Sequence, residues 1–273
     1  MRRFAPCIAM WVLFESIAVL LWQVLDNPFY LLNFTYIGTC VAGGLALYAC
    51  KWKHARRFVQ FAVGSYMLVF LGFIQHENMQ IEGFWYYLFL GVFQGATIHY
   101  LIAKIGGPAL FGRGWCGYAC WTAMILDLFP WKTSSGRRKG LGWVRYAVCA
   151  GSLVFVVATL LLGIADDSLF FIAFIIGNAL YYLVGIGLAI AFKDNRAFCK
   201  YICPVGELMK PTAYISLSRV RCDSDKCVSC GACKRVCPMD VDMTDNSKKR
   251  TNGTECILCG ECINACPKGA LKF

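Results

Sequence analysis

Six long apolar segments constrain this 273-residue chain more than any other feature of its sequence. They lie near residues 7–26, 30–50, 58–75, 84–103, 143–164 and 168–192. Each is close to the length of about 20 residues that an α-helix needs to cross the hydrocarbon core of a bilayer. Only 16% of the residues are charged, against roughly 25% in soluble domains. The sequence therefore predicts an all-α polytopic membrane domain with about six transmembrane helices.

The basic residues alternate with these segments. Lys and Arg are absent from residues 4–50, 58–103 and 146–192, and they cluster in the stretches between and after them. Loops rich in Lys and Arg stay on the cytoplasmic side of a membrane. This pattern predicts a multi-pass protein of the cell (inner) membrane with both termini in the cytoplasm. Topology and anionic lipid explain the net charge of +11, so no nucleic-acid partner is expected.

Two cysteine runs near the C-terminus carry the most specific chemical signal. Residues 227–238 read CVSCGACKRVCP, and residues 256–267 read CILCGECINACP. Both follow the C-x2-C-x2-C-x3-C-P pattern of bacterial ferredoxins, in which the fourth cysteine ligates the other cluster. We therefore expect a membrane domain over 1–214 and a cytoplasmic α+β ferredoxin-like domain with two [4Fe–4S] clusters over 215–273.

The same rule assigns the ligands of each cluster. The first cluster is expected on Cys227, Cys230, Cys233 and Cys266. The second is expected on Cys256, Cys259, Cys262 and Cys237. Zinc also binds C-x2-C pairs, but three closely spaced thiols plus a fourth in each run favour iron–sulfur chemistry. Cys222 fits no position of the motif, and we interpret it as a spare or structural thiol.

Two more cysteine pairs, Cys116 with Cys120 and Cys199 with Cys203, follow even-numbered apolar segments. We call these four residues the edge cysteines. If each pair is helical, its two thiols share one face about 5–6 Å apart. Four thiols that meet would bind a third iron–sulfur cluster or form a dithiol relay. Packing as small hydrophobic side chains is the remaining interpretation, and the residues alone leave all three open.

The combination resembles the NapH/MauN-type membrane ferredoxins and their relatives, the NosR-type and CcoG/RdxA-type [4Fe–4S] membrane proteins. GRGWCGYACW, RAFCKYICPVG, CVSCGACKRVCPMDVD and CILCGECINACPKGAL carry the resemblance, which covers about residues 110–273. It implies C-x3-C-P pairs at the cytoplasmic membrane edge, a pattern that Pro204 keeps and Trp121 breaks. It also implies electron transfer among the quinone pool, cytoplasmic donors and redox partners.

Several polar residues fall within the apolar segments, where such groups are costly and often functional. They are Glu15, Gln94, His99 and Asn178. His99 with Tyr100 would supply the hydrogen-bonding group that a quinone site needs. Hydrogen bonding between helices is the simpler explanation for all of them.

These observations favour a membrane-bound electron-transfer subunit. It would relay electrons between a cytoplasmic donor or acceptor and the quinone pool or a partner redox protein. No substrate-transforming residues are evident, so catalysis is expected to belong to a partner protein or another membrane subunit. The alternative is an assembly factor for a metalloenzyme, in which the edge cysteines handle copper or iron–sulfur, since thiolates suit Cu(I). Met124 and Met209 lie near them in the sequence.

Overall fold

A computed structural model describes residues 4–93, 95–131, 136–138, 140–246 and 253–273. Within them, five helical spans are long and apolar enough to cross a membrane. They are α1 (Ala5–Leu25), α2 (Pro28–Ala49), α3 (Ala55–Ser65) continued by the π-helix η2 (Tyr66–Ile74), α9 (Val144–Leu161) and α10 (Asp167–Phe192). The prediction of a helical membrane protein is confirmed at this level.

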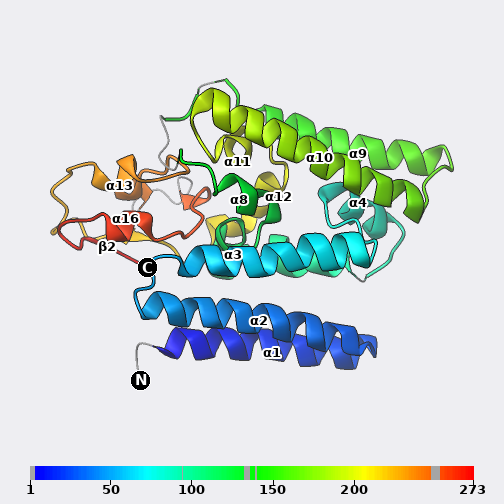
Figure 1. The fold of residues 1–273 in the computed structure, drawn as a ribbon, viewed down its shortest axis with the longest axis horizontal. Coiled ribbons are helices and arrows are strands. Elements are labelled where there is room, and N and C mark those ends of the chain that lie inside the picture. The colour runs from blue at the N-terminus through cyan, green and yellow to red at the C-terminus, as the bar shows by residue number, and fades with distance from the viewer. Residues whose placement is uncertain (1–3, 94, 132–135, 139, 247–252) are drawn as a thin grey trace.

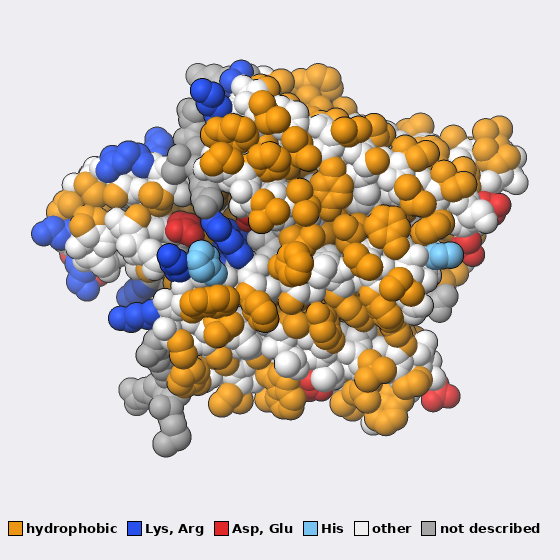
Figure 2. Space-filling model, viewed as in Figure 1, with side chains coloured by type: hydrophobic (Ala, Val, Ile, Leu, Met, Phe, Trp, Pro, Cys, Tyr) orange, Lys and Arg blue, Asp and Glu red, His pale blue; other side chains and the backbone are white. Residues whose placement is uncertain are grey.

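The long helices lie roughly side by side, and the ferredoxin-like part lies at one end of them (Figure 1). The α1–α2 hairpin forms one side, α9 and α10 form the other, and α3 packs on both α2 and the short α8 (Trp121–Leu126). The start of α1 and the C-terminal residue lie at the ferredoxin end (Figure 1). Figure 2 shows hydrophobic side chains over the helices and most visible Lys and Arg side chains gathered toward that same end.

The segment predicted as a fourth continuous helix, near 84–103, is broken instead. It consists of α4 (Ile81–Phe89), a turn, α5 (Ala96–His99) and the π-helix η3 (Tyr100–Gly106). Gly91 and Gly95 in the turn have φ of +70° and +50°, a conformation that glycine adopts without steric cost and that ends a helix. The prediction of one uninterrupted crossing here is therefore wrong.

The chain is also irregular just before α4. Asn78 and Gln80 are buried outside any helix, and the Asn78 side-chain amide donates to the Phe170 carbonyl at 2.9 Å. Irregular backbone is tolerated at membrane depth only where it is buried in protein or lines a cavity. This irregular stretch, just before the predicted fourth crossing, is therefore packed inside the protein, whereas Phe89, Leu90 and Phe93 of the predicted crossing are exposed.

Short elements complete the fold. In the membrane domain they are α6 (Pro108–Phe111), α7 (Gly114–Tyr118), α11 (Ala197–Tyr201) and α12 (Val205–Tyr214). In the ferredoxin-like part they are β1 (Arg221–Cys222), α13 (Ala232–Arg235), α14 (Met243–Asn246), α16 (Glu261–Asn264) and β2 (Leu271–Lys272). Strands β1 and β2 pair antiparallel, so the start and the end of this part are joined.

Candidate metal centres

The ferredoxin-like part contains two hollows lined by cysteines. One, the first site, is lined by Cys227, Cys230, Cys233, Cys266 and also Cys222. The other, the second site, is lined by Cys237, Cys256, Cys259 and Cys262. The hollows measure about 380 and 300 Å³, including the parts open to solvent. In each site the fourth cysteine of one run lies with the first three of the other run.

Ligands of a cubane bind different iron corners, so they surround a hollow rather than converge on one point. Among the described residues, no three His, Cys, Asp or Glu side chains are grouped as ligands of a single metal ion. The arrangement of thiols around a hollow has the form that a cluster needs. The presence of Cys222 in the first site adds a fifth thiol, which the motif did not predict there.

The loops that carry the first three cysteines bend in the same way in both runs. Ser229 and Leu258 have φ of +51° and +54°, and Gly231 and Gly260 follow two residues later with +71° and +77°. A bulky residue such as Leu258 adopts positive φ only where its surroundings force it, and such positions gather at functional sites. These bends fold the backbone around the hollow, so the loop is shaped for a group of cluster size.

Backbone N–H groups point at the fourth sulfur of both runs. Val241 N donates to Cys237 Sγ and Ala270 N donates to Cys266 Sγ, each at 3.3 Å. The bond from Ala270 is the main cause that lowers the pKa of the Cys266 thiol. Burial raises the pKa of the Cys256 thiol to about 12, so the second site is the more enclosed of the two. Hydrogen bonds to sulfur favour the thiolate and tune cluster potentials.

The edge cysteines belong to an internal repeat that includes an arginine. Residues 113–120 and 196–203 both fit R-x-[WF]-C-x-Y-x-C. Arg113 Nη2 lies 4.0 Å from Cys116 Sγ, and Arg196 Nη1 lies 3.9 Å from Cys199 Sγ. The sequence prediction rested on the cysteines alone and missed these arginines, although their equal offset was visible in the sequence.

Each edge pair spans the end of a helix rather than one helical face. Cys116 lies within α7 and Cys199 within α11, whereas Cys120 and Cys203 follow the ends of these helices. Cys120 has extended backbone, with φ −72° and ψ 118°. The expectation that both thiols of a pair share a helical face is therefore wrong, because both helices end before the second cysteine.

The structure nevertheless brings the two pairs together. Arg196 Nη1 donates to the Cys116 carbonyl at 3.0 Å while it lies beside Cys199, so one guanidinium joins both repeats. The Cys203 thiol interacts electrostatically with those of Cys199, Cys116 and Cys120. Cys116 and Cys199 are only 7% and 5% exposed. The four thiols therefore form one group, with Cys120 and Cys203 partly buried, which we call the edge site.

Three buried cations surround the edge site. They are Lys104, Arg113 and Arg196, each at most 4% exposed. Lys104 Nζ lies 4.5 Å from the Trp115 ring centroid. The thiols of Cys120, Cys116 and Cys203 interact electrostatically with the Lys104 ammonium and favour its charged form. Buried charges are costly unless they are compensated. Arg113 pairs with Glu255 and Arg196 pairs with Asp127, whereas no carboxylate pairs with Lys104 in the described part of the chain. Thiolates bound to iron would supply a counter-charge for Lys104, so the donor set and its surroundings fit a [4Fe–4S] cluster.

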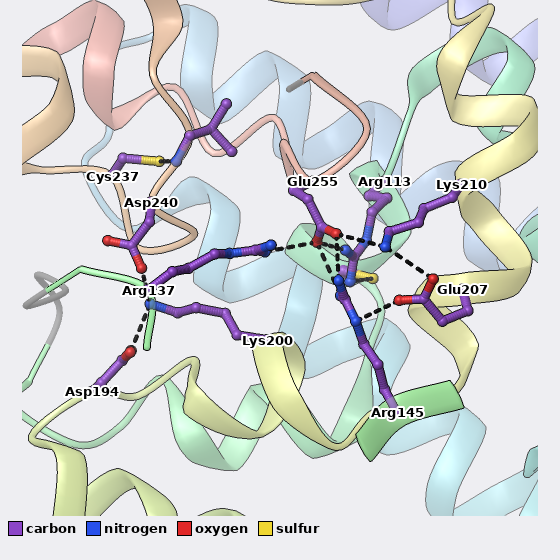
Figure 3. A network of polar contacts seen from close by, with 12 residues as sticks. Arg113, Arg137, Arg145, Asp194, Lys200, Glu207, Lys210, Cys237, Asp240 and Glu255 are labelled. Atoms are coloured by element: carbon purple, nitrogen blue, oxygen red, sulfur yellow. Dashed lines mark hydrogen bonds and ion pairs between the residues drawn. The ribbon is translucent and has the colours of Figure 1, made fainter. Parts of the chain in front are cut away.

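The Glu255 carboxylate fixes the ferredoxin-like part to the membrane part (Figure 3). Glu255 forms ion pairs with Arg113, with Arg145 at 3.0 Å, with Arg137 at 3.1 Å and with Lys210 at 3.2 Å. Burial alone would raise the carboxyl pKa, but Arg113, Arg137 and Arg145 hold the pKa of Glu255 well below its usual range. Arg113 therefore contacts both the edge site and the residue that precedes Cys256.

A second ionic link lies on the other side of the second site. Lys200, within the second repeat, binds Asp194 and Asp240, each at 2.6 Å (Figure 3). Asp240 is three residues from Cys237, which lines the second site. Both ionic links thus attach next to second-site cysteines. The second site faces the membrane part, while the first site lies farther out, where Cys230 is exposed.

The remaining polar residues singled out in the sequence have different surroundings. Thr35 Oγ1 donates to Glu15 at 2.9 Å. This bond joins α1 to α2, so for Glu15 the expected hydrogen bond between helices is confirmed. Asn178 accepts from Trp121 Nε1 at 2.9 Å. Gln94 lies outside the described residues. The ring of His99 meets that of Trp115 edge-on, with centroids 4.7 Å apart.

Two iron–sulfur family models match the chain. A model described as a 4Fe-4S dicluster domain matches residues 226–271. A model described as a 4Fe-4S binding domain matches residues 99–140 and 176–220, the two stretches that contain the edge cysteines. The matched residues therefore include both halves of the internal repeat as well as the two C-terminal runs.

Whole-chain relatives extend the likeness into the membrane part. The methylamine utilization ferredoxin-type protein MauN of Methylobacillus flagellatus is 28% identical over 71% of this chain and 78% of its own. MauN of Paracoccus denitrificans is 26% identical over 70% and 77%. Over about 70% of its length, the chain is therefore similar to the ferredoxin-type proteins of the MauN kind. The resemblance to the MauN type noted from the sequence is thus confirmed.

An uncharacterised protein of Methanocaldococcus jannaschii is 30% identical to this membrane ferredoxin over 157 residues. That match covers 55% of this chain and 61% of the relative, so it spans less than two thirds of the relative's length. No solved structure matches the chain. The arrangement of the three sites is therefore described from the structure of this chain alone.

The docking of Glu255 leads to a stability prediction. Glu255→Gln removes the carboxylate that pairs with the buried Arg113, and one of the two that pair with Arg145, which also pairs with Glu207. Breaking a buried pair costs about 3–5 kcal/mol. Because the folded pKa of Glu255 is depressed, its stabilisation is present above the unfolded value of about 4.3. The difference between variant and wild type should shrink only as pH falls below that value. Denaturant unfolding in detergent measures both effects.

The exposed acid Glu261, at the start of α16, provides the matched control. Glu261→Gln removes the same charge from the same part of the chain without uncovering a buried cation. Its unfolding free energy should stay within about 0.5 kcal/mol of wild type. Equal stability of the two variants at neutral pH would contradict the docking role of Glu255.

Proposed function

We propose that this membrane ferredoxin is an electron relay in which the edge site holds a third [4Fe–4S] cluster, in line with the clusters of the second and first sites. An electron-transfer role through [4Fe–4S] clusters is supported by its ferredoxin-type relatives and by the two family models. The relay would join a cytoplasmic donor or acceptor to the quinone pool or a partner redox protein. Both chain termini would be cytoplasmic.

The environment of the edge cysteines is the observation that carries the proposal. Lys104, Arg113 and Arg196 are buried around the four edge thiols, of which Cys116 and Cys199 are buried and Cys120 and Cys203 are partly buried. An iron–sulfur cluster on four thiolates bears a net negative charge, which such cations stabilise. Arg113 and Arg196 are paired with Glu255 and Asp127, but no carboxylate pairs with Lys104 among the described residues, so neutral thiols would leave this buried cation without a counter-charge, which is unfavourable.

Contacts between the edge and second sites support the order of the relay. A Cβ added to Gly117, the residue after Cys116, would lie 2.4 Å from the Ile257 carbonyl oxygen. Tyr118 Oη donates to the Leu258 carbonyl at 3.0 Å. Helix α7 therefore packs directly on the loop that follows Cys256. Electrons would pass from the edge site to the second site and on to the exposed first site, or in reverse.

The residues would have distinct roles in such a relay. The cysteines hold the clusters, which supply one-electron carriers whose potentials depend on hydrogen bonds, charge and exposure. Arg196 joins the two halves of the edge site, and Arg113 and Arg196 lower the energy of added negative charge. The backbone N–H groups of Val241 and Ala270 donate to the sulfurs of the ligands Cys237 and Cys266.

A dithiol relay at the edge cysteines is disfavoured by their burial. Exchange requires an accessible thiolate. Burial raises the pKa of the Cys199 thiol to about 11, with Arg196 acting against it. With so little of Cys116 and Cys199 exposed, a partner disulfide has no direct access to either sulfur.

One observation favours the alternative of a metal-handling assembly factor. Met209 Sδ lies 3.7 Å from Cys116 Sγ. A thioether beside thiols is a soft donor set that suits Cu(I). Met124, the other methionine considered, contacts Gly64 of α3 instead. The two functions differ in the metal that the edge site retains.

Metal content tests the third cluster. Anaerobically purified wild-type protein should contain about twelve irons and as many acid-labile sulfides per chain, for three cubanes. Cys116→Ala/Cys199→Ala should contain about eight, because only the first and second sites remain. Elemental analysis and sulfide assays give both values.

The matched control is Cys149→Ala, since this cysteine of α9 lies outside all three sites. It should leave the iron content unchanged. A wild type with about eight irons would refute the third cluster. Retention of copper by the wild type but not by the double variant would favour the assembly factor.

The buried charge of Lys104 should set the potential of the edge cluster. Lys104→Met removes a positive charge near the edge cysteines, so reduction becomes less favourable. The midpoint potential should fall by about 60 mV or more, which is about 1.4 kcal/mol for one electron. A potentiometric titration followed by electron paramagnetic resonance measures the shift.

Lys104→Arg keeps the charge and serves as the control, with a potential close to that of wild type. The clusters of the first and second sites should be unaffected in both variants, because Lys104 packs on Trp115 and Trp121 of the edge region. An unchanged edge potential in Lys104→Met would show that this charge does not act on the cluster.

A further inference from the structure

A large groove runs between the α1–α2 hairpin and the body of the protein. Its empty volume is about 2760 Å³, part of it open at the surface. Its enclosed volume of about 910 Å³ is at the upper end of the roughly 300–1,000 Å³ that small-molecule sites usually measure, so the groove has room for a large, elongated ligand. Apolar side chains of α1, α2 and η3 line most of its length.

Among the polar side chains in the lining, Glu77 and His99 can each accept a proton. His99 is 9% exposed, and among the described residues no hydrogen-bond partner reaches its Nε2. Glu77 lies in the same groove, and its Oε2 is likewise without a partner in the described part of the chain. Unpaired buried polar atoms are costly, so a ligand that bonds to both would relieve that cost.

Glu77 and His99 lie close to each other through Gly95. A Cβ on Gly95 would stand 2.3 Å from Glu77 Oε2, so the carboxylate rests against this glycine. His99 N donates to the Gly95 carbonyl at 3.0 Å, which places His99 one helical turn further on. Burial raises the pKa of Glu77 to about 7, so this carboxyl can take up and release a proton near neutral pH.

The same place is connected to the edge site. The His99 ring contacts the ring of Trp115, and Trp115 immediately precedes Cys116 in α7. An occupant of the groove at His99 is therefore separated from the edge site by one indole ring. A proton-accepting pair on one side and a route for single electrons on the other suit a carrier that exchanges both.

We infer that the groove binds an isoprenoid quinone, with its ring between Glu77 and His99 and its tail along α1 and α2. The inference rests on the proposed electron relay and gives its membrane partner a site and catalytic residues. When a quinol is oxidised there, its two O–H bonds break. One proton passes to His99 Nε2 and the other to the Glu77 carboxylate.

The two electrons leave one at a time past Trp115 to the oxidised [4Fe–4S] centre that the edge cysteines are proposed to hold, and then to the second site. Quinone reduction follows the same path in reverse. Glu77 and His99 touch the substrate and act on its protons, so conservative changes at either should slow the reaction without affecting cluster assembly.

The experiment uses the full-length, cluster-loaded protein in nanodiscs under anaerobic conditions. Decylubiquinol and menadiol serve as the two probes, and bleaching of the visible iron–sulfur absorption reports reduction. In wild type at least one probe should reduce the clusters. Glu77→Gln and His99→Gln, which keep size and polarity but remove the base, should slow reduction by about a hundredfold or more. Dithionite should reduce all three proteins equally.

A matched pair of variants tests the groove itself. Leu13 lines it, whereas Leu20 on the same helix lies outside it and is exposed. Leu13→Trp should raise the half-saturating concentration of the quinol about tenfold. Leu20→Trp should leave it unchanged.

The outcomes separate this inference from the relay. If dithionite reveals no edge cluster, the proposed relay fails. If dithionite reduces the edge cluster but neither quinol does, or if both Gln variants react at the wild-type rate, the relay stands and the quinone site is wrong. A copurified phospholipid that decylubiquinone does not displace would also overturn the inference.

Discussion

The contact between Glu255 and Arg113 determines how the metal sites lie relative to one another. Both side chains are almost completely buried, with 8% and 0% of the side chain exposed. Arg113 also lies beside Cys116, and Glu255 precedes Cys256, so a single ion pair joins the edge site to the second site. Buried ion pairs add little net stability, but losing one partner is costly. The pair therefore fixes a geometry more than it strengthens the fold.

The same burial changes the meaning of the positive charges. From the sequence, the cluster of basic residues from Lys104 to Arg145 was explained by topology and lipid attraction. Lys104, Arg113 and Arg145 are instead buried, and so are Arg196 and Lys200. Hydropathy and charge patterns indicate on which side of the membrane a loop lies, but they do not indicate whether a given side chain is buried. The pattern thus placed these residues on one side of the membrane, but it could not show that they surround thiols or hold a carboxylate.

How much the sequence could predict depended on how local the signal was. The two ferredoxin runs are local patterns, and each predicted set of four cysteines lines one hollow. The edge site depends on segments about 80 residues apart, and only its arginine offset is local. The broken fourth helix was missed for another reason. Its apolar window is real, but Gly91 and Gly95 adopt positive φ there, and glycine also occurs within ordinary membrane helices.

The two halves of the edge repeat have diverged, and the divergence is consistent with one point of entry for electrons. At the aromatic position, Trp115 meets His99 in the groove, whereas Phe198 packs against Tyr181 of α10. After the second cysteine, Trp121 replaces proline and bonds to Asn178. The half with Trp115 thus borders the groove, and the half with Phe198 packs against α10 in the interior of the protein. The four edge cysteines, which come from two similar repeats, would then be reached by a membrane carrier only through the Trp115 half. The edge site packs on the second site through α7.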